Sequence, residues 1–366
     1  MQAFGTGALR GRAEPEDNRE QAVWMPAFPL GSPGWRQSAE PLCVQDRSGL
    51  GVAGELNSFG VWADARGVWT SASWGSVNNG GPTKVRFNDG HRWVTWLQDE
   101  VGGRDTPIPA TNQLSGFPNG PLMLLNYRSY DFSPSIAPAD SVALLDSSSL
   151  TFEPPLGTSS DSFAVAAFGI GATDGYALIQ ERVANPSSTV HRYRGEHTWS
   201  LVGPIYTSAS AIWASDTQVL VATDRWLFRH APSDSQFLPM PLAPVTEYHS
   251  VWAFSDDDIW AGTGDGQLAH FDGVGWTLQS TGLNTPITRL WGSDGELFYI
   301  SEAHFGRVRN GLPETLIADT AQVRFWDLWG RSSKEVFITL TDPTLAKYRC
   351  GPKRILWFDG ELFHTF

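Results

Sequence analysis

The chain has 366 residues, of which 26 are Lys or Arg and 39 are Asp or Glu, so its formal net charge is −13. This balance argues against binding to nucleic acid or to an anionic membrane surface, although in most proteins an acidic charge only favours solubility. Every apolar run is shorter than the roughly 18 residues that a membrane-spanning helix needs, so we expect no membrane insertion.

Residues 1–55 differ in composition from the rest of the chain. A polar, Gly-rich lead (MQAFGTGALRGRAEPEDNREQ) is followed by an aromatic and Pro-rich segment (AVWMPAFPLGSPGWRQSAEPLCVQD). We predict that the second segment is an ordered arm that packs on the domain after it. The start lacks the basic residues and apolar core of a signal peptide. Either the protein is secreted or part of the cell envelope and its signal has been removed, or, as the alternative, it is cytoplasmic.

The stretch 250–280 (SVWAFSDDDIWAGTGDGQLAHFDGVGWTLQS) contains four short apolar runs separated by clusters of Asp and Gly. Runs of about five residues rich in Val, Ile, Trp and Phe are typical of strands, and the Gly and Asp clusters interrupt each run before it reaches helical length. The stretch therefore predicts a unit of four antiparallel strands.

Related units occur on both sides of this stretch. A tryptophan recurs in the first predicted strand at intervals of 39, 39 and 38 residues, and a hydrophobic residue follows it seven or eight positions later. A fixed period of this length is the signature of a repeat architecture. The pairs are Trp62 with Trp69, Trp213 with Leu220, Trp252 with Trp260, Trp291 with Phe298 and Trp329 with Phe337.

Two weaker copies occupy the interval between Trp62 and Trp213, around NQLSGFPNGPLMLLNY and DSFAVAAFGIGATDGYALIQ. The third-to-fourth strand turn supports the same alignment, since it recurs as FNDGHRW, YRGEHTW, FDGVGW, RNGLPE and FDGELF. We therefore predict an all-β fold, a seven-bladed β-propeller of four-stranded antiparallel blades over residues 56–366. The predicted blades start near residues 56, 112, 160, 208, 247, 286 and 324.

We interpret the recurrent tryptophans as core residues that pack between neighbouring blades, since an indole ring buries roughly 150 to 250 Å². The units SVWAFSDDDIWAGTGDGQLAHFDGVGWTLQS and TRLWGSDGELFYIS resemble the Trp-rich propeller repeats of bacterial secreted and cell-surface proteins. That resemblance implies an architecture and no particular activity. The sialidase Asp-box, the kelch double Gly and the Trp-Asp repeat dipeptides are missing in register.

The two cysteines, Cys43 and Cys350, lie in the predicted arm and in the last blade. A closed ring brings its ends together, so a disulfide between them would tie the arm to the closure. In the chain-entropy model, closing so long a loop contributes on the order of 4 to 5 kcal/mol. Two buried thiols are the alternative, and the sequence leaves both open.

Catalytic and metal motifs are sparse. The eight His residues show no metal-ligand spacing, and the SDDD stretch at 255–258 lacks the alternating Asp pattern of a calcium loop. The Gly-rich stretches precede no predicted helix, so they indicate turns and not phosphate sites. We predict no metal and no cofactor.

One asymmetry of the repeats suggests a binding surface. Units one, two, three and seven carry insertions between the second and third strands, and these units are consecutive in a closed ring. The insertions would form a contiguous wall, although surface loops also tolerate insertion without a function. The predicted ligand-binding residues are Trp74, Tyr127, Arg128, Tyr130, Asp131, Glu181, Arg182, Lys347, Tyr348 and Arg349.

Aromatic and Arg side chains favour recognition of a partner, so we expect a monomeric, non-catalytic propeller that binds a glycan, peptide or protein. The alternative is a polysaccharide lyase or glycoside hydrolase with its site on the same face. That alternative needs a converging acid–base set, which the sequence does not identify.

Overall fold

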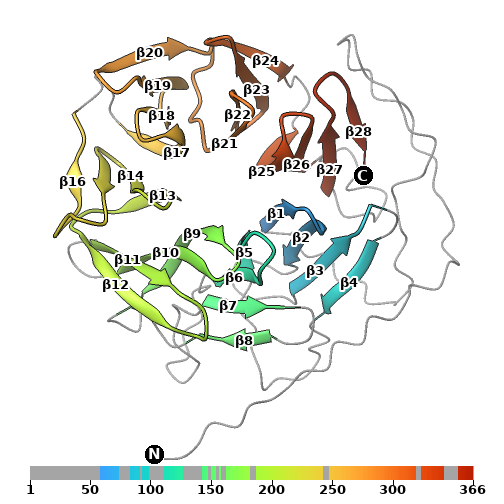
Figure 1. The fold of residues 1–366 in the computed structure, drawn as a ribbon. Helices are drawn as coiled ribbons and strands as arrows, with labels where there is room; N and C mark the ends of the chain where they lie inside the picture. Colours follow the sequence, from blue (N-terminus) through green and yellow to red (C-terminus); the bar gives the residue numbers. More distant parts are fainter. Residues whose placement is uncertain are drawn as a thin grey trace, which may run out of the picture.

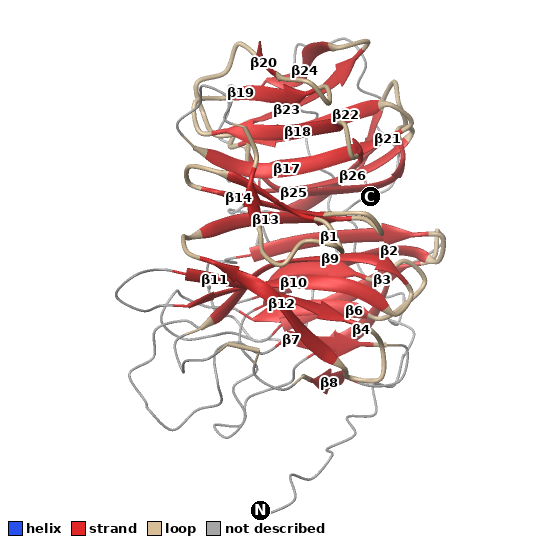
Figure 2. Cartoon of the chain, turned by 60° about the vertical axis from the view of Figure 1, so that its left-hand side comes forward, coloured by secondary structure: helices blue, strands red, loops and turns tan. Residues whose placement is uncertain are grey.

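The computed structural model describes residues 58–73, 83–90, 93–98, 111–126, 142–146, 150–153, 156–157, 162–181, 187–241, 247–318, 323–341 and 353–365. All regular structure in these ranges is β-strand, as Figure 2 shows. None of the described residues belongs to a helix that could cross a membrane. The predicted arm (1–55) and both cysteines lie outside the described residues, so the predicted disulfide stays a prediction.

The strands form seven four-stranded antiparallel sheets, each from consecutive strands of the chain. Blade 1 contains β1 (Ser58–Asp64), β2 (Gly67–Ser73), β3 (Thr83–Asn88) and β4 (Trp93–Gln98). Blade 2 contains β5 (Thr111–Gly116), β6 (Leu122–Asn126), β7 (Val142–Leu145) and β8 (Leu150–Phe152). Blade 3 contains β9 (Phe163–Gly171), β10 (Asp174–Glu181), β11 (Ser187–Tyr193) and β12 (Trp199–Ile205).

The remaining blades follow the same order. Blade 4 contains β13 (Ala209–Ala214), β14 (Val219–Thr223), β15 (Leu227–His230) and β16 (Leu238–Pro239). Blade 5 contains β17 (Tyr248–Ser255), β18 (Asp258–Thr263), β19 (Gln267–Phe271) and β20 (Trp276–Ser280). Blade 6 contains β21 (Arg289–Ser293), β22 (Glu296–Ser301), β23 (His304–Arg309) and β24 (Leu312–Ala318). Blade 7 contains β25 (Arg324–Ser332), β26 (Glu335–Thr341), β27 (Lys353–Phe358) and β28 (Phe363–Thr365).

The sheets stand around a common axis as a closed ring (Figure 1), which confirms the prediction of a seven-bladed propeller. The first strand of each blade is innermost and contacts the first strands of its two neighbours, including β1 against β25. Blade 7 takes all four of its strands from the C-terminal part of the chain. Among the described residues, the ring is therefore closed by side-chain packing and polar contacts between blades 7 and 1, and not by an exchanged strand.

The hydrophobic core is divided among the interfaces between blades. The described residues form seven buried clusters, and each cluster joins the facing sides of two neighbouring blades. One of them packs Val61, Ala63 and Val68 of blade 1 against Phe337 and Ile355 of blade 7. The closing interface thus buries apolar side chains as the other six interfaces do.

The tryptophan pairs identified in the sequence are direct cross-strand partners of the first and second strands. Such pairs lie close enough to stabilise an antiparallel ladder. The register places Trp62 opposite Trp69, Trp213 opposite Leu220, Trp252 opposite Trp260, Trp291 opposite Phe298 and Trp329 opposite Phe337.

A small residue follows each recurrent aromatic residue, and the contacts explain why. The side chain of Trp291 covers Gly330 of the next blade, where a Cβ would lie 2.5 Å from the indole. Gly116 faces Trp62 of the preceding blade in the same way. The aromatic ring of one blade thus lies over the small residue of the next.

The prediction that the tryptophans are core residues is correct for Trp62, Trp213 and Trp291, which are at most 7% exposed. Trp252 and Trp329 are less buried, because they also reach across the central channel. Their ring centroids lie 6.1 Å apart, and Phe168 of blade 3 lies 5.8 Å from Trp252 and 5.9 Å from Trp329. These three rings, from blades 3, 5 and 7, form an aromatic plug across the channel.

Asp327 of β25 holds the closing interface from the side of blade 7. Its carboxylate accepts the backbone N–H of Val61 in blade 1 at 3.1 Å and the Nε–H of Arg289 in blade 6 at 3.3 Å. Burial raises the pKa of the Asp327 carboxyl, and Arg289 opposes the shift. One buried carboxylate therefore links three blades. Trp329 adds a second link, since its Nε1–H donates to the carbonyl of Ala63 at 3.1 Å.

The contact between aromatic and small residues can be tested with Gly292, which follows Trp291 in the first strand of blade 6. A Cβ at Gly292 would lie 2.5 Å from Cζ of Phe254 and 2.8 Å from Nε1 of Trp252. We expect Gly292→Ala to destabilise the fold by about 1 to 3 kcal/mol, as overpacking does. The measurement is urea unfolding. Gly275→Ala is the control, because a Cβ there meets no atom within 4 Å, and equal stability of the two variants would contradict the contact.

The closure predicts a large effect of Asp327→Ala. The change leaves the N–H of Val61 and the guanidinium of Arg289 without their buried acceptor, so we expect a loss of about 2 to 4 kcal/mol in the free energy of unfolding. Glu302→Ala removes an exposed partner of Arg324 and should cost less than about 1 kcal/mol. A loss of less than about 1 kcal/mol for Asp327→Ala would show that the carboxylate does not stabilise the closed ring.

Candidate functional site

The two faces of the ring differ in the connections that they carry. The connections between second and third strands, and those between blades, lie on one face, which we call the long-hairpin face. The turns between first and second and between third and fourth strands lie on the other, the short-turn face. The second-to-third connections are short in blades 4, 5 and 6 and longer in the others, at 74–82, 127–141, 182–186 and 342–352.

Of the ten residues predicted to bind a ligand, only Glu181 is described. It ends β10 at the long-hairpin face, is 4% exposed and accepts a hydrogen bond from the hydroxyl of Ser162 at 2.5 Å. A carboxylate buried and bonded in this way positions the end of β10. The other nine residues lie outside the described residues, so their shared surface stays a prediction.

His191 of β11 lies near this carboxylate and is 9% exposed. Its Nε2 lies 3.1 Å from the hydroxyl of Thr189. Burial lowers the pKa of the His191 imidazole to about 4, and the charge of Glu181 partly opposes the shift. His191 is therefore neutral at physiological pH in the folded protein.

The central channel holds a cavity of about 90 Å³ on the long-hairpin side of the aromatic plug, lined by the first strands of all seven blades. A ligand pocket usually has roughly 300 to 1,000 Å³, whereas a water molecule occupies about 30 Å³. Hydroxyls on the lining are used for contacts between blades: Ser115, Ser210 and Ser250 each donate to a backbone carbonyl of the next blade. The cavity is therefore large enough for a few water molecules and too small for a typical ligand.

Charged and aromatic side chains surround the channel on the long-hairpin face. Arg289 begins β21, and Arg324 begins β25 and pairs with Glu302 at 2.9 Å. Trp326 lies at a register shift of β25, one residue before Asp327, and is 38% exposed. Blades 6 and 7 thus bring an indole and two guanidinium groups to one rim.

The aromatic rings that are exposed, among the residues whose side-chain exposure the structure describes, lie on this face. Tyr206, in the connection from blade 3 to blade 4, is 87% exposed, and Trp226, in the short hairpin of blade 4, is 38% exposed. A hydrogen bond of 2.9 Å between Thr207 and Asp224 joins the two loops that carry them. The sequence analysis missed Tyr206, Trp226 and Trp326. Their signal in the sequence is that they are aromatic residues outside the recurrent core positions.

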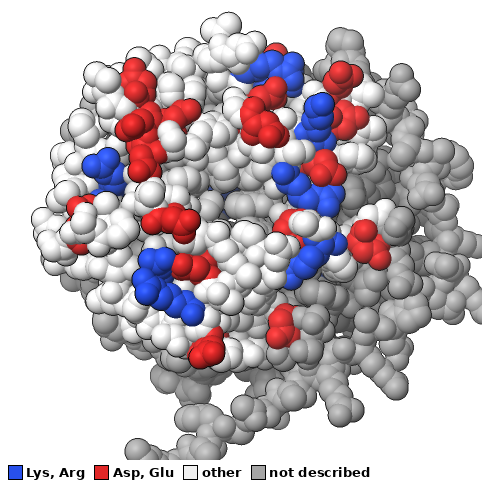
Figure 3. Space-filling view, in the orientation of Figure 1, with Lys and Arg blue, Asp and Glu red and all other residues white. Residues whose placement is uncertain are grey.

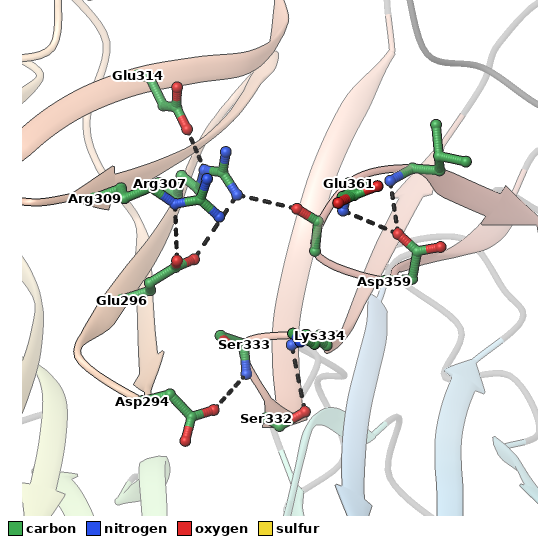
Figure 4. Close-up of polar contacts among 12 residues, drawn as sticks. Asp294, Glu296, Arg307, Arg309, Glu314, Ser332, Ser333, Lys334, Asp359 and Glu361 are labelled. Atoms are coloured by element: carbon green, nitrogen blue, oxygen red, sulfur yellow. Dashed lines mark hydrogen bonds and ion pairs between the residues drawn. The ribbon is translucent and has the colours of Figure 1, made fainter.

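The short-turn face is held by polar contacts between neighbouring blades, shown for blades 6 and 7 in Figure 4. Arg307 pairs with Glu314 and also donates to the carbonyl of Gly360 in blade 7 at 3.2 Å. The N–H of Ser333 donates to Asp294 across the same interface at 3.0 Å. In the view of Figure 3, acidic side chains gather over blade 5, whereas both signs alternate around much of the ring.

Groups of His, Cys, Asp and Glu suited to a metal ion do not occur within the described ranges. The acidic stretch at 255–258 makes contacts within a turn and with aromatic rings. The hydroxyl of Ser255 accepts the N–H of Asp257 at 3.3 Å, and Asp258 accepts the indole N–H of Trp260 at 2.8 Å. His270 stacks on Trp260 and bonds to the same carboxylate.

No protein-family model and no curated protein matches this sequence, so the resemblance to Trp-rich bacterial propellers stays a prediction. Solved structures match the fold. YCF48 bound to a D1 peptide has a TM-score of 0.58 at 12% identity, over 84% of this chain and 94% of its own. YCF48 from Cyanidioschyzon merolae has a TM-score of 0.59 at 9% identity, over 85% of this chain and 98% of its own. The WD40 propeller of Doa1 has a TM-score of 0.55 at 12% identity, over 79% of this chain and 90% of its own.

The buried imidazole of His191 predicts a pH dependence of stability. Its pKa of about 4 in the folded protein is below the ordinary value of 6.5, so the unfolded chain binds the proton first as pH falls. Neutral His191 therefore contributes on the order of 3 kcal/mol to the free energy of unfolding. This contribution is fully present above about pH 6.5 and is lost as pH falls toward 4. Urea unfolding at several pH values should show a flatter profile for His191→Leu than for the wild type. Parallel profiles would contradict a neutral buried His191.

Proposed function

We propose that the chain is a non-catalytic recognition propeller that binds an extended peptide segment of a protein partner on its long-hairpin face. The observation that carries the proposal is the concentration of exposed aromatic rings, Tyr206, Trp226 and Trp326, on this one face. Aromatic and Arg side chains dominate the energy of typical recognition surfaces. An exposed indole also combines a large apolar face with a polar N–H.

The scaffold supports recognition because it is rigid under this face. The innermost strands are fixed by buried clusters on both sides and by hydrogen bonds between blades. A preorganised surface binds without a large entropic cost of ordering. The blocked channel excludes a ligand that threads the ring, so a partner has to lie across the face.

The predicted insertion wall gives the same face a second set of anchors. Connections 342–352, 74–82, 127–141 and 182–186 join strands of four consecutive blades of the closed ring. We propose that the wall residues, among them Tyr130, Arg182 and Tyr348, contact the partner together with the three described rings.

A propeller of similar fold has been solved with a peptide, YCF48 with D1 peptide, and this supports a peptide as the partner of the present chain. At 12% identity the similarity lies in the fold, so no residue of that complex is carried over. The sequence also predicted glycan as a ligand class, and the experiment distinguishes glycan binding from peptide binding.

The test starts from a displayed library of random 12-residue peptides, panned against the full chain. We expect enriched peptides whose affinity falls by more than about 1 kcal/mol in Tyr206→Ala, Trp226→Ala or Trp326→Ala, which is the usual threshold for a recognition anchor. Because these rings are exposed, the melting temperature should change little. Isothermal titration calorimetry and thermal unfolding measure the two quantities.

Val274→Ala and Asp265→Asn serve as controls. Val274 is 92% exposed on the short-turn face, and Asp265 lies in the short hairpin of blade 5. Peptides that bind all three aromatic variants as tightly as the wild type would overturn the proposal. So would a glycan array showing binding or degradation products in the absence of any peptide ligand.

A further inference from the structure

A second hollow lies on the short-turn face, on the opposite side of the aromatic plug. Its volume is about 540 Å³, within the range of about 300 to 1,000 Å³ that is typical of ligand pockets. It straddles the ring closure and is lined by four blades, 6, 7, 1 and 2. The lining residues are Trp62, Ala63, Asp64, Ala65, Pro118, Trp291, Trp329, Gly330, Arg331 and Glu335.

The floor of this hollow is aromatic and fixed. The rings of Trp62 and Trp329 lie with centroids 4.2 Å apart and planes tilted by 32°, and the indole N–H of Trp329 donates to the carbonyl of Ala63. Trp329 is the half-buried member, whereas Trp62 and Trp291 are nearly fully buried. The floor thus offers part of one indole and the edges of two others, which suits a narrow aliphatic stem.

Most charges on the rim are already paired. Asp64 holds Arg66 at 2.7 Å and also accepts the N–H of Asn119 at 3.0 Å. Arg331 donates to Glu335 at 2.8 Å and to the carbonyl of Asp64. These pairs leave the guanidinium groups little capacity for an anionic ligand.

Glu335 on the rim is engaged through only one of its two carboxylate oxygens by its pair with Arg331. Its side chain is 38% exposed, and only its Oε1 atom receives a hydrogen bond from a described residue. An aromatic floor beside a carboxylate with an open oxygen is suited to a cation on an aliphatic stem, through packing, cation–π attraction and a charge-assisted hydrogen bond. The side chains of Lys and Arg have that form.

Charge on the same face favours a basic partner. The turns of blades 4 and 5 present five aspartates, and the acidic sector over blade 5 is visible in Figure 3. Hydrogen bonds from the backbone of Gly275 and Val274 lower the pKa of the Asp272 carboxyl, which keeps it ionised. With a net charge of −13, the protein attracts cations at long range. The aspartates are Asp216, Asp256, Asp257, Asp258 and Asp272.

We propose that the hollow is a docking site for a basic segment of a partner protein, with one Lys or Arg side chain inserted over Trp329 and bound to Glu335. Neighbouring basic residues of the segment face the aspartates of blades 4 and 5. The site lies on the face opposite to the proposed peptide-recognition surface and does not depend on it. A chain with both sites holds two protein segments on opposite sides of one rigid ring.

The test uses a fluorescein-labelled peptide Gly-Ser-Gly-Arg-Lys-Arg-Gly-Ser-Gly and the same peptide with Glu at the three basic positions, in fluorescence anisotropy with the full chain. We expect the basic peptide to bind and the acidic one not to bind. Glu335→Gln, which removes the open carboxylate, and Ala65→Arg, which places a cation at the exposed rim, should each raise the Kd about fivefold or more.

Two controls separate this site from general attraction by an acidic protein. Asp265→Asn removes one carboxylate from the long-hairpin face, and Trp326→Ala disturbs the other proposed site, so both should leave the Kd of the basic peptide within about twofold. Melting temperatures show whether Glu335→Gln and Ala65→Arg are folded. Absence of binding by the wild type, or equal Kd values for the wild type and both hollow variants, would overturn the docking site.

Discussion

The structure depends on one repeated contact, an aromatic ring of one innermost strand lying over the small residue of the next. Trp62 lies over Gly116, Trp252 over Gly292 and Trp291 over Gly330, and at the closure Trp329 donates to the carbonyl of Ala63. Each contact sets the distance and direction between two neighbouring blades. The contact occurs between blades 1 and 2, between blades 5 and 6, and between blades 6 and 7, and the hydrogen bond from Trp329 to Ala63 places the indole of blade 7 at the corresponding position of blade 1.

The same contact determines what the molecule can offer to a partner. Rings that are long enough to cover the next blade also meet in the channel, where Phe168, Trp252 and Trp329 form the plug. The plug separates a small cavity of about 90 Å³ from a larger hollow of about 540 Å³. Both proposed recognition sites therefore lie on the faces of the ring and not along a route through it. One face presents exposed aromatic rings, and the other presents paired charges with a partly engaged carboxylate.

Much of the fold could be predicted from the sequence, because the contact leaves a local trace. Trp213, Trp252 and Trp291 recur at 39 residues, each precedes Ala or Gly, and each has its cross-strand partner at seven or eight positions. The meeting of rings in the channel could not be predicted, since alternation along a strand does not tell which side faces the axis. The hydrogen bond between Asp327 and the backbone N–H of Val61 could not be predicted either, because the two residues are 266 positions apart and only closure of the ring brings them together. Glu181 was predicted to bind a ligand because it adjoins an insertion, but its carboxylate is buried and accepts a hydrogen bond from Ser162. The length of a loop does not indicate such a contact.

Hydrogen exchange at the amide of Val61 tests most directly whether side-chain contacts alone close the ring. This N–H bonds to Asp327 across the closing interface, whereas Val221 of β14 lies in an unbroken sheet of blade 4. Under native conditions the two amides should exchange with the same free energy, that of global unfolding, because closure and blade stability are one cooperative unit. Exchange of Val61 through an opening that costs several kcal/mol less than that of Val221 would show that blades 7 and 1 separate by themselves, and would contradict the account.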